Sequence, residues 1–138
     1  MNRRYIRRKA WDDQKRRVLR MVEAGAPCAL CGDPIDPGAR WIVRDGRREL
    51  SPWSLEADER LAPSRGGDQY DPDNIQPAHR LCNQLKSDKT PAEWARWLAL
   101  YAARHGERYS VGAYLAGRTA PAPERIAEGH DGSTSRAW

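Results

Sequence analysis

Three cysteines and one histidine form two pairs of equal spacing, Cys28-x-x-Cys31 and His79-x-x-Cys82. Thiolates two residues apart bind one tetrahedral Zn²⁺, and a second pair of ligands completes its coordination. Because residues three apart share one face of a helix, His79 and Cys82 are expected to approach the ion from one side. The pattern predicts a structural zinc site, since four protein ligands leave no open position for catalysis. A redox pair is disfavoured because no βαβ pattern surrounds Cys28 and Cys31. Inert thiols beside a bystander histidine are the alternative.

Polar residues with a different chemistry lie between these two pairs. Asp58 and Glu59 are adjacent at the end of a predicted strand, Asn74 begins a second predicted strand, and Asn83 directly follows Cys82. Carboxylate and amide oxygens bind hard divalent cations, and a carboxylate can also accept a proton from water. Taken alone, the Asp-Glu pair is more typical of two solvated charges at a strand end than of a catalytic site.

The order of these short segments resembles the HNH endonuclease family. The likeness covers residues 27–90, and it rests on Leu55-Glu56-Ala57-Asp58-Glu59, Pro63-Ser64-Arg65-Gly66-Gly67, Asp73-Asn74-Ile75-Gln76-Pro77 and Cys82-Asn83. It implies a small α+β fold with a zinc-stapled ββα-metal core and flanking N- and C-terminal helices. The activity that it implies is metal-dependent hydrolysis of phosphodiester bonds in DNA.

The resemblance also implies a role for each matching residue. Asp58 and Asn83 correspond to the ligands of the catalytic divalent ion, Mg²⁺ or Mn²⁺. Asn74 corresponds to the asparagine that orients the loop and backbone around the general base. Phage-type members of the family are similar in having an Asp-Glu pair before the Gly-Gly loop. This likeness implies phage genome processing, with phage packaging proteins as partners.

Glu59 departs from the family pattern, which usually has a histidine general base at this position. A glutamate has a reference pKa of about 4.3 and is a weaker base than imidazole. The like charge of Asp58 is expected to raise the pKa of Glu59, and a nearby cation is expected to lower it. Two functions therefore stay open. One is an endonuclease with Glu59 as base, and the other is a catalytically degenerate zinc-containing module that binds nucleic acid.

Basic residues are concentrated at the N-terminus. The 138-residue chain has 24 Lys and Arg against 19 Asp and Glu, and nine of the basic residues but only two acidic ones lie in residues 1–20. Phosphate contacts release counterions, so such an arm is typical of a DNA-binding element, although a solvated helix face is an equal alternative. The expected phosphate contacts are Arg3, Arg4, Arg7, Arg8, Arg65, Arg80 and Lys86.

The elements that must position these residues follow from hydrophobic spacing and turn chemistry. Asp45-Gly46 predicts a two-residue hairpin between strands over 40–44 and 47–50. Thr90 and Pro91 predict a capped helix that ends before Gly106. The remaining predicted elements are a helix over 11–24 with Trp11, Val18, Leu19 and Val22 on one face, strands over 54–59 and 74–76 around a loop over 63–73, a helix over 78–86, and a core face of Trp94, Trp97, Leu98 and Tyr101.

Composition sets the domain organisation. Only 39% of the residues are hydrophobic and mean hydropathy is −0.89, so the core is expected to be modest and zinc is expected to stabilise it. We expect a basic arm and helix over 1–24, the zinc-bound unit over 25–90, a packing helix and extension over 91–116, and a disordered tail over 117–138. No long apolar run or secretory signal is visible, which favours a cytoplasmic protein without a membrane partner.

Overall fold

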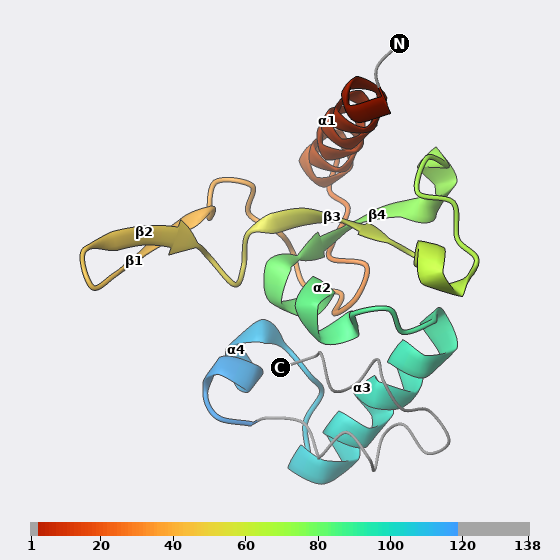
Figure 1. Cartoon of the computed structure of the whole chain (residues 1–138). Helices are drawn as coiled ribbons and strands as arrows, with labels where there is room; N and C mark the ends of the chain where they lie inside the picture. The colour runs from red at the N-terminus through yellow and green to blue at the C-terminus, as the bar shows by residue number, and fades with distance from the viewer. Residues whose placement is uncertain (1–2, 119–138) are drawn as a thin grey trace.

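Four α-helices and two separate antiparallel sheets of two strands each make up residues 3–118, the part of the chain that the computed structural model describes (Figure 1). The small α+β class is therefore confirmed. The elements in chain order are α1 (Arg3–Glu23), β1 (Trp41–Arg44), β2 (Arg47–Leu50), β3 (Leu55–Glu59), the 3-10 turns η1 (Pro63–Arg65) and η2 (Pro72–Asn74), β4 (Ile75–His79), α2 (Arg80–Lys86), α3 (Pro91–His105) and α4 (Val111–Leu115).

Helix α1 begins eight residues earlier than the predicted start at residue 11 and extends away from the rest of the molecule (Figure 1). Only its C-terminal half is packed, where Val18 and Val22 are buried against the body of the protein. Trp11 and Leu19 are exposed, so their predicted place on a buried face is wrong. The helix ends at Glu23, one residue before the predicted end at 24, and Gly25 after it has a φ of 101° that favours glycine.

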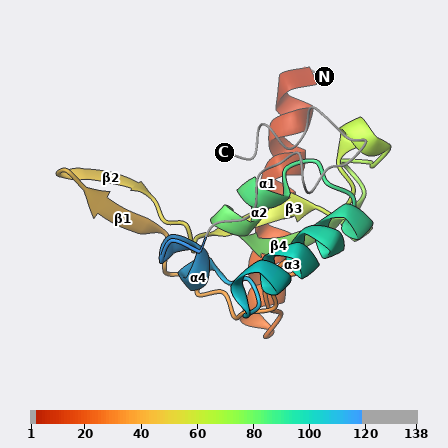
Figure 2. The same cartoon turned by 90° about the horizontal axis from the view of Figure 1, so that it is seen from below.

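Strands β1 and β2 form the predicted hairpin, with Trp41 paired to Leu50 and Arg44 paired to Arg47. Asp45 and Gly46 both have positive φ, as a two-residue turn between twisted strands requires. The hairpin projects sideways from the other elements in both views (Figures 1 and 2).

Strands β3 and β4 form the second sheet, in a register that pairs Leu55 with His79 and Glu59 with Ile75. Strand β4 continues through Pro77, beyond the predicted end at residue 76. A two-stranded sheet leaves one side of each strand unpaired, so a proline without an N–H group can be accommodated. As a result α2 begins at Arg80, and His79 belongs to the strand rather than to the predicted helix over 78–86.

Helix α3 has the predicted boundaries and supplies the aromatic core. Thr90 and Glu93 form a capping box, and Gly106 ends the helix with a φ of 69°. Trp94, Trp97 and Tyr101 are buried, with the two indole rings stacked at a centroid distance of 4.8 Å.

Helix α4 follows within the predicted C-terminal extension. Most of the tail predicted to be disordered, residues 119–138, lies outside the described residues.

The loop between β3 and β4 turns at two glycines and is closed by backbone hydrogen bonds. Gly66 has a φ of 96°, and the N–H of Gly67 donates to the carbonyl of Ala62 at 3.0 Å. A Cβ atom at Gly67 would lie 1.7 Å from the carbonyl oxygen of Leu61. Only glycine therefore fits at this position.

No helix within residues 3–118 combines the length and apolarity of a membrane span.

Gly67→Ala is expected to lower the free energy of unfolding by about 1–3 kcal/mol, because the new methyl group overlaps backbone rather than a flexible side chain. Urea unfolding followed by circular dichroism measures this change. Gly112→Ala is the matched control, since its Cβ would meet nothing within 4 Å. Equal midpoints for Gly67→Ala and the parent would contradict this account of the loop.

Candidate metal centre and catalytic face

The two predicted ligand pairs come together at one point. The ligand atoms of Cys28, Cys31, His79 and Cys82 all lie within 4.8 Å of one another. Cys28 and Cys31 come from the loop after α1, His79 ends β4, and Cys82 lies in the first turn of α2. Within residues 3–118 this is the one group of three or more His, Cys, Asp or Glu side chains close enough to hold a metal ion. The predicted clustering is confirmed.

The distances suit a tetrahedral ion. The Nδ1 atom of His79 lies 3.4 Å from the sulfur of Cys31 and 3.8 Å from the sulfur of Cys82. Zinc bonds of about 2.0–2.3 Å give ligand separations of about 3.5–3.8 Å at tetrahedral angles. The Nε2 atom of His79 lies 3.1 Å from the carbonyl oxygen of Pro34. When Nε2–H donates to this oxygen, Nδ1 keeps its lone pair for the metal.

Hydrogen bonds to the sulfur of Cys28 favour the thiolate form that zinc requires. The backbone N–H groups of Leu30 and His79 each donate to the sulfur of Cys28 at 3.4 Å. Hydrogen bonds from Cys31 and Cys82 lower the pKa of Cys28. The hydroxyl of Tyr109 lies 3.1 Å from the sulfur of Cys82, and burial raises the pKa of Tyr109, so its hydroxyl stays protonated as a donor.

The His79 imidazole holds a proton when no metal is present. Burial lowers its pKa, but the sulfurs of Cys28 and Cys31 outweigh that effect and raise the pKa to about 10. A metal ion must displace this proton, because only the neutral ring offers a lone pair. Zinc binding is therefore accompanied by proton release.

The loop that carries Cys28 and Cys31 is fixed from two sides. The N–H of Ala29 donates to the carbonyl of Pro77 in β4 at 2.9 Å. The indole N–H of Trp94 in α3 donates to the carbonyl of Leu30, also at 2.9 Å. The group of Cys28, Cys31, His79 and Cys82 thus lies where the loop, the β3–β4 sheet and the aromatic core meet.

A row of acids on β3 faces a row of polar and basic residues on α2. Glu56 accepts hydrogen bonds from Arg80 at 2.7 Å and from Asn83 at 3.0 Å. Asp58 accepts one from Lys86 at 3.1 Å. Glu56 was not among the predicted site residues. The sequence does contain a signal for this role of Glu56. Residues two apart on a strand share a face, as Glu56 and Asp58 do, and the facing helix offers polar and basic residues three positions apart.

This arrangement does not place Asp58 and Asn83 at a common metal-binding point. Gln76 donates to Asp58 at 2.8 Å, and the Lys86 ammonium balances the charge of the carboxylate. Asn83 is instead hydrogen bonded to Glu56. Burial raises the pKa of Asp58 although Lys86 acts in the opposite direction. As arranged here, these residues do not fit a catalytic Mg²⁺ or Mn²⁺, because the lysine ammonium holds the cation position at Asp58.

Glu59 lies on the other face of the sheet. Side chains alternate along a strand, so Glu59 shares its face with its pairing partner Ile75 and not with Asp58. Its Oε2 atom is buried and has no hydrogen-bond partner within residues 3–118. Burial and the charge of Asp58 raise the pKa of Glu59, which confirms the expected effect of Asp58. A carboxylate with a raised pKa and a free lone pair is suited to accept a proton.

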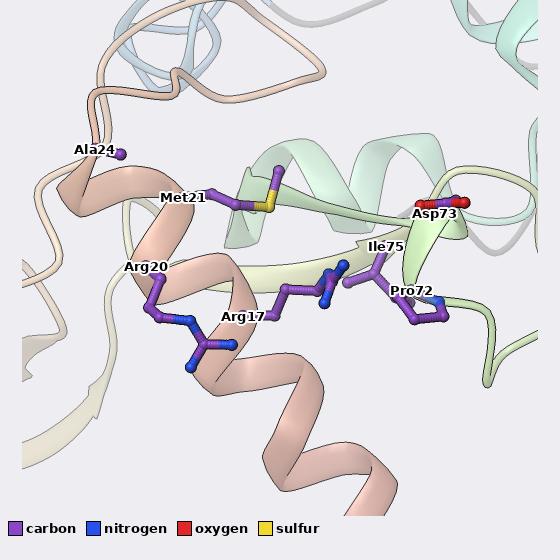
Figure 3. A pocket seen from close by; sticks show the side chains of 7 residues that line it. All are labelled: Arg17, Arg20, Met21, Ala24, Pro72, Asp73 and Ile75. Carbon is purple, nitrogen blue, oxygen red and sulfur yellow. The ribbon is translucent and has the colours of Figure 1, made fainter.

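An open pocket of about 540 Å³ lies on the same side of the sheet, between α1 and the start of β4 (Figure 3). Arg17 reaches from α1 toward Pro72 and Ile75, whereas Arg20 extends along the helix surface (Figure 3). Neither guanidinium has an ion-pair partner within residues 3–118. Sequence analysis did not single out these two arginines, although their spacing of three residues places them on one side of the helix. The full lining is Arg17, Arg20, Met21, Ala24, Pro72, Asp73 and Ile75.

The other predicted polar residues have separate environments. Asn74 exchanges two hydrogen bonds with the backbone of Leu61, both at 2.9 Å, and so fixes the loop after Glu59. Arg65 forms a two-pronged ion pair with Glu93 at 2.9 and 3.2 Å.

The predicted phosphate contacts divide by exposure. Arg4, Arg7 and Arg8 are exposed on α1, to which Arg3 also belongs. Arg80 is paired with Glu56. Lys86 is 1% exposed and paired with Asp58, so it does not fit the predicted contact with phosphate. Its stem is enclosed by the packing of α2 on β3.

Comparison with protein-family models, curated proteins and solved structures finds no match to this chain.

Cys31→Ser is expected to abolish tight binding of one zinc ion per chain and to destabilise the fold by several kcal/mol, since binding and folding of such a site are coupled. Metal analysis and urea unfolding measure the two effects. Tyr109→Phe is the matched control, because it removes only the hydroxyl next to Cys82 and should cost about 1 kcal/mol while zinc is retained. Unchanged stability and metal content in Cys31→Ser would contradict a structural zinc site.

Proposed function

We propose that this chain is a zinc-stabilised endonuclease of the HNH type that hydrolyses phosphodiester bonds in DNA. The observation that carries the proposal is Glu59, a carboxylate with a raised pKa and an unpartnered oxygen at the end of β3. Its face of the sheet also borders the pocket that Arg17 and Arg20 line. The resemblance of residues 27–90 to HNH endonucleases supports the same function.

In this proposal the arginines bind DNA and Glu59 moves the proton. A guanidinium suits phosphate because its planar fork can donate two hydrogen bonds. Glu59 accepts a proton from water as the oxygen of that water attacks phosphorus in line with the departing 3′-oxygen. The departing oxygen takes up a proton, so the products are a 5′-phosphate and a 3′-hydroxyl. Asn74 keeps the loop after Glu59 in place.

Metal dependence enters the proposal through the family resemblance. Mg²⁺ or Mn²⁺ would be held by Asp58 and Asn83, which face α2 whereas Glu59 faces α1, so in this arrangement the ion would supply positive charge from the other side of β3 and would not share a phosphate contact with Glu59. Asp58 can take this role only when the Lys86 ammonium moves away from it. Competition between lysine and a divalent cation is thus a property that the proposal requires.

A second candidate function is a non-catalytic zinc module that binds DNA. The buried pair between Lys86 and Asp58 favours it, because each charge is compensated inside the protein. In this case Glu59 has lost the catalytic role of the family histidine. Binding would then involve the exposed arginines of α1.

Glu59→Gln is expected to reduce plasmid nicking by roughly 100-fold or more while DNA binding persists, because an amide cannot accept the proton. The activity of the parent should fall as pH drops through the pKa of Glu59. Since burial and Asp58 raise that pKa, the fall should lie at a higher pH than for an ordinary glutamate. Glu59→His should retain activity, because imidazole can also accept the proton.

Glu23→Gln is the control for this experiment, since Glu23 is exposed near the end of α1. If Glu59→Gln nicks DNA as fast as the parent, Glu59 is not the base. If only Glu59→His is active, the parent is the non-catalytic module.

Lys86→Met should lower the Mn²⁺ concentration needed for half-maximal nicking, because Asp58 is released from its ammonium partner. The same variant should lose about 3 kcal/mol or more of stability, since it leaves a buried carboxylate unpaired. Lys86→Arg keeps the charge and should show the Mn²⁺ dependence of the parent. Absence of nicking in all three proteins over the whole Mn²⁺ titration would support the non-catalytic candidate. An unchanged Mn²⁺ dependence in Lys86→Met would exclude Asp58 as a ligand.

A further inference from the structure

The β1–β2 hairpin presents an apolar face to solvent. The register places Trp41, Val43, Arg48 and Leu50 on one side of the ribbon, because Trp41 pairs with Leu50 and Val43 pairs with Arg48. The three apolar side chains on this face are 44%, 75% and 36% exposed. Both views show the ribbon standing apart from the helices and from the β3–β4 sheet (Figures 1 and 2). No element within residues 3–118 covers it.

Guanidinium groups lie on this apolar face beside Trp41 and on the opposite side of the ribbon at the turn. The guanidinium of Arg48 lies 4.3 Å from the centre of the Trp41 ring, and that of Arg40 lies 5.5 Å from it. Arg44 and Arg47 face each other beside the turn. Two acids, Asp45 and Glu49, lie among these four arginines, and Glu49 forms an ion pair with Arg44 at 3.2 Å. The ribbon therefore has a net positive charge and an apolar centre.

We propose that the β1–β2 hairpin is a second DNA-binding element, which enters a groove of the duplex. A two-stranded ribbon fits the major groove, which is about 12 Å wide. Trp41 and Val43 would then contact base edges and thymine methyl groups, while Arg44 and Arg47 at the tip bind the flanking phosphates. The stacked guanidinium groups restrict the Trp41 ring before binding, which reduces the entropy lost on contact.

Charge favours DNA over a protein partner on this surface. An apolar face alone would also suit another protein. A second copy of this chain, however, would bring the arginines of two ribbons together, and such like-charge contacts are unfavourable. A polyanion complements the arginines and leaves the apolar centre in contact with the groove. The inference rests on the proposed function only in taking DNA as the ligand, and it requires no hydrolysis.

The test measures binding of the full chain to a labelled duplex of about 30 base pairs, in buffer without added divalent metal, over a range of salt concentrations. Trp41→Ala combined with Val43→Ser should weaken binding about tenfold, since central aromatic contacts dominate interfaces. Arg44→Gln combined with Arg47→Gln should lower the salt slope by about 2, which corresponds to two phosphate contacts. Hydrogen exchange should show that the duplex protects residues 41–50.

The matched controls are exposed residues of α3 and α4. Leu115→Ser changes an exposed apolar residue, and Arg96→Gln combined with Arg104→Gln removes two exposed arginines. Both should bind like the parent, and zinc content and melting temperature should show that every variant is folded.

Four outcomes separate this inference from the proposed nuclease activity. If the parent binds DNA and both hairpin variants bind equally well, the hairpin inference is wrong and the nuclease proposal is unaffected. If the variants lose binding but the parent does not nick DNA, the hairpin inference stands and the nuclease proposal fails. If the parent binds no DNA, both fail. If Trp41→Ala instead dissolves a dimer seen by sedimentation, the hairpin is a self-association surface and the DNA inference is overturned.

Discussion

The rest of the structure depends on the contact of four side chains that could together hold a metal ion and that come from two distant segments. Cys28 and Cys31 belong to the loop after α1, whereas His79 and Cys82 lie where β4 meets α2, and their ligand atoms are within 4.8 Å of one another. A bound zinc would contribute on the order of 10 kcal/mol to folding at neutral pH. That contribution is large for a chain in which only 39% of the residues are hydrophobic. The same cluster fixes the end of β4, and hence the register that sets the positions of Asp58 and Glu59.

The β3–β4 sheet separates two electrostatic environments. Toward α2, Glu56 and Asp58 are compensated by Arg80 and Lys86, so this face is an internal polar network. Toward α1, Glu59 keeps an unpartnered oxygen, and Arg17 and Arg20 line an open pocket. A polar network that is satisfied within the protein stabilises the fold, whereas uncompensated groups at a surface are available to a ligand. In our proposal, chemistry therefore takes place on the α1 side, and a metal ion would have to compete with lysine on the α2 side.

Local sequence signals predicted what depends on local geometry. The ligand spacings, the Asp45-Gly46 turn and the Thr90 cap each specify a conformation within a few residues, and the structure contains all three. Apart from the meeting of the two ligand pairs, contacts between distant residues were not predictable in this way. Lys86 is a good phosphate-binding residue by type, yet the packing of α2 on β3 buries it against Asp58. Trp11 and Leu19 fit a helical pattern, but α1 extends beyond the body that could cover them. Alternation along the strand separates Asp58 from Glu59, but which of them faces α1 and which faces α2 became clear only from the packing of the helices on β3 and β4.

The most direct test of the central claim is native mass spectrometry of the full chain, purified under reducing conditions without added metal. Our account predicts a folded species whose mass corresponds to one zinc ion per chain, and a shift to unfolded charge states when a chelator removes the zinc. A metal-free species with the same folded charge states and an unchanged melting transition would contradict it. In that case the close approach of Cys28, Cys31, His79 and Cys82 would not be what holds this fold together.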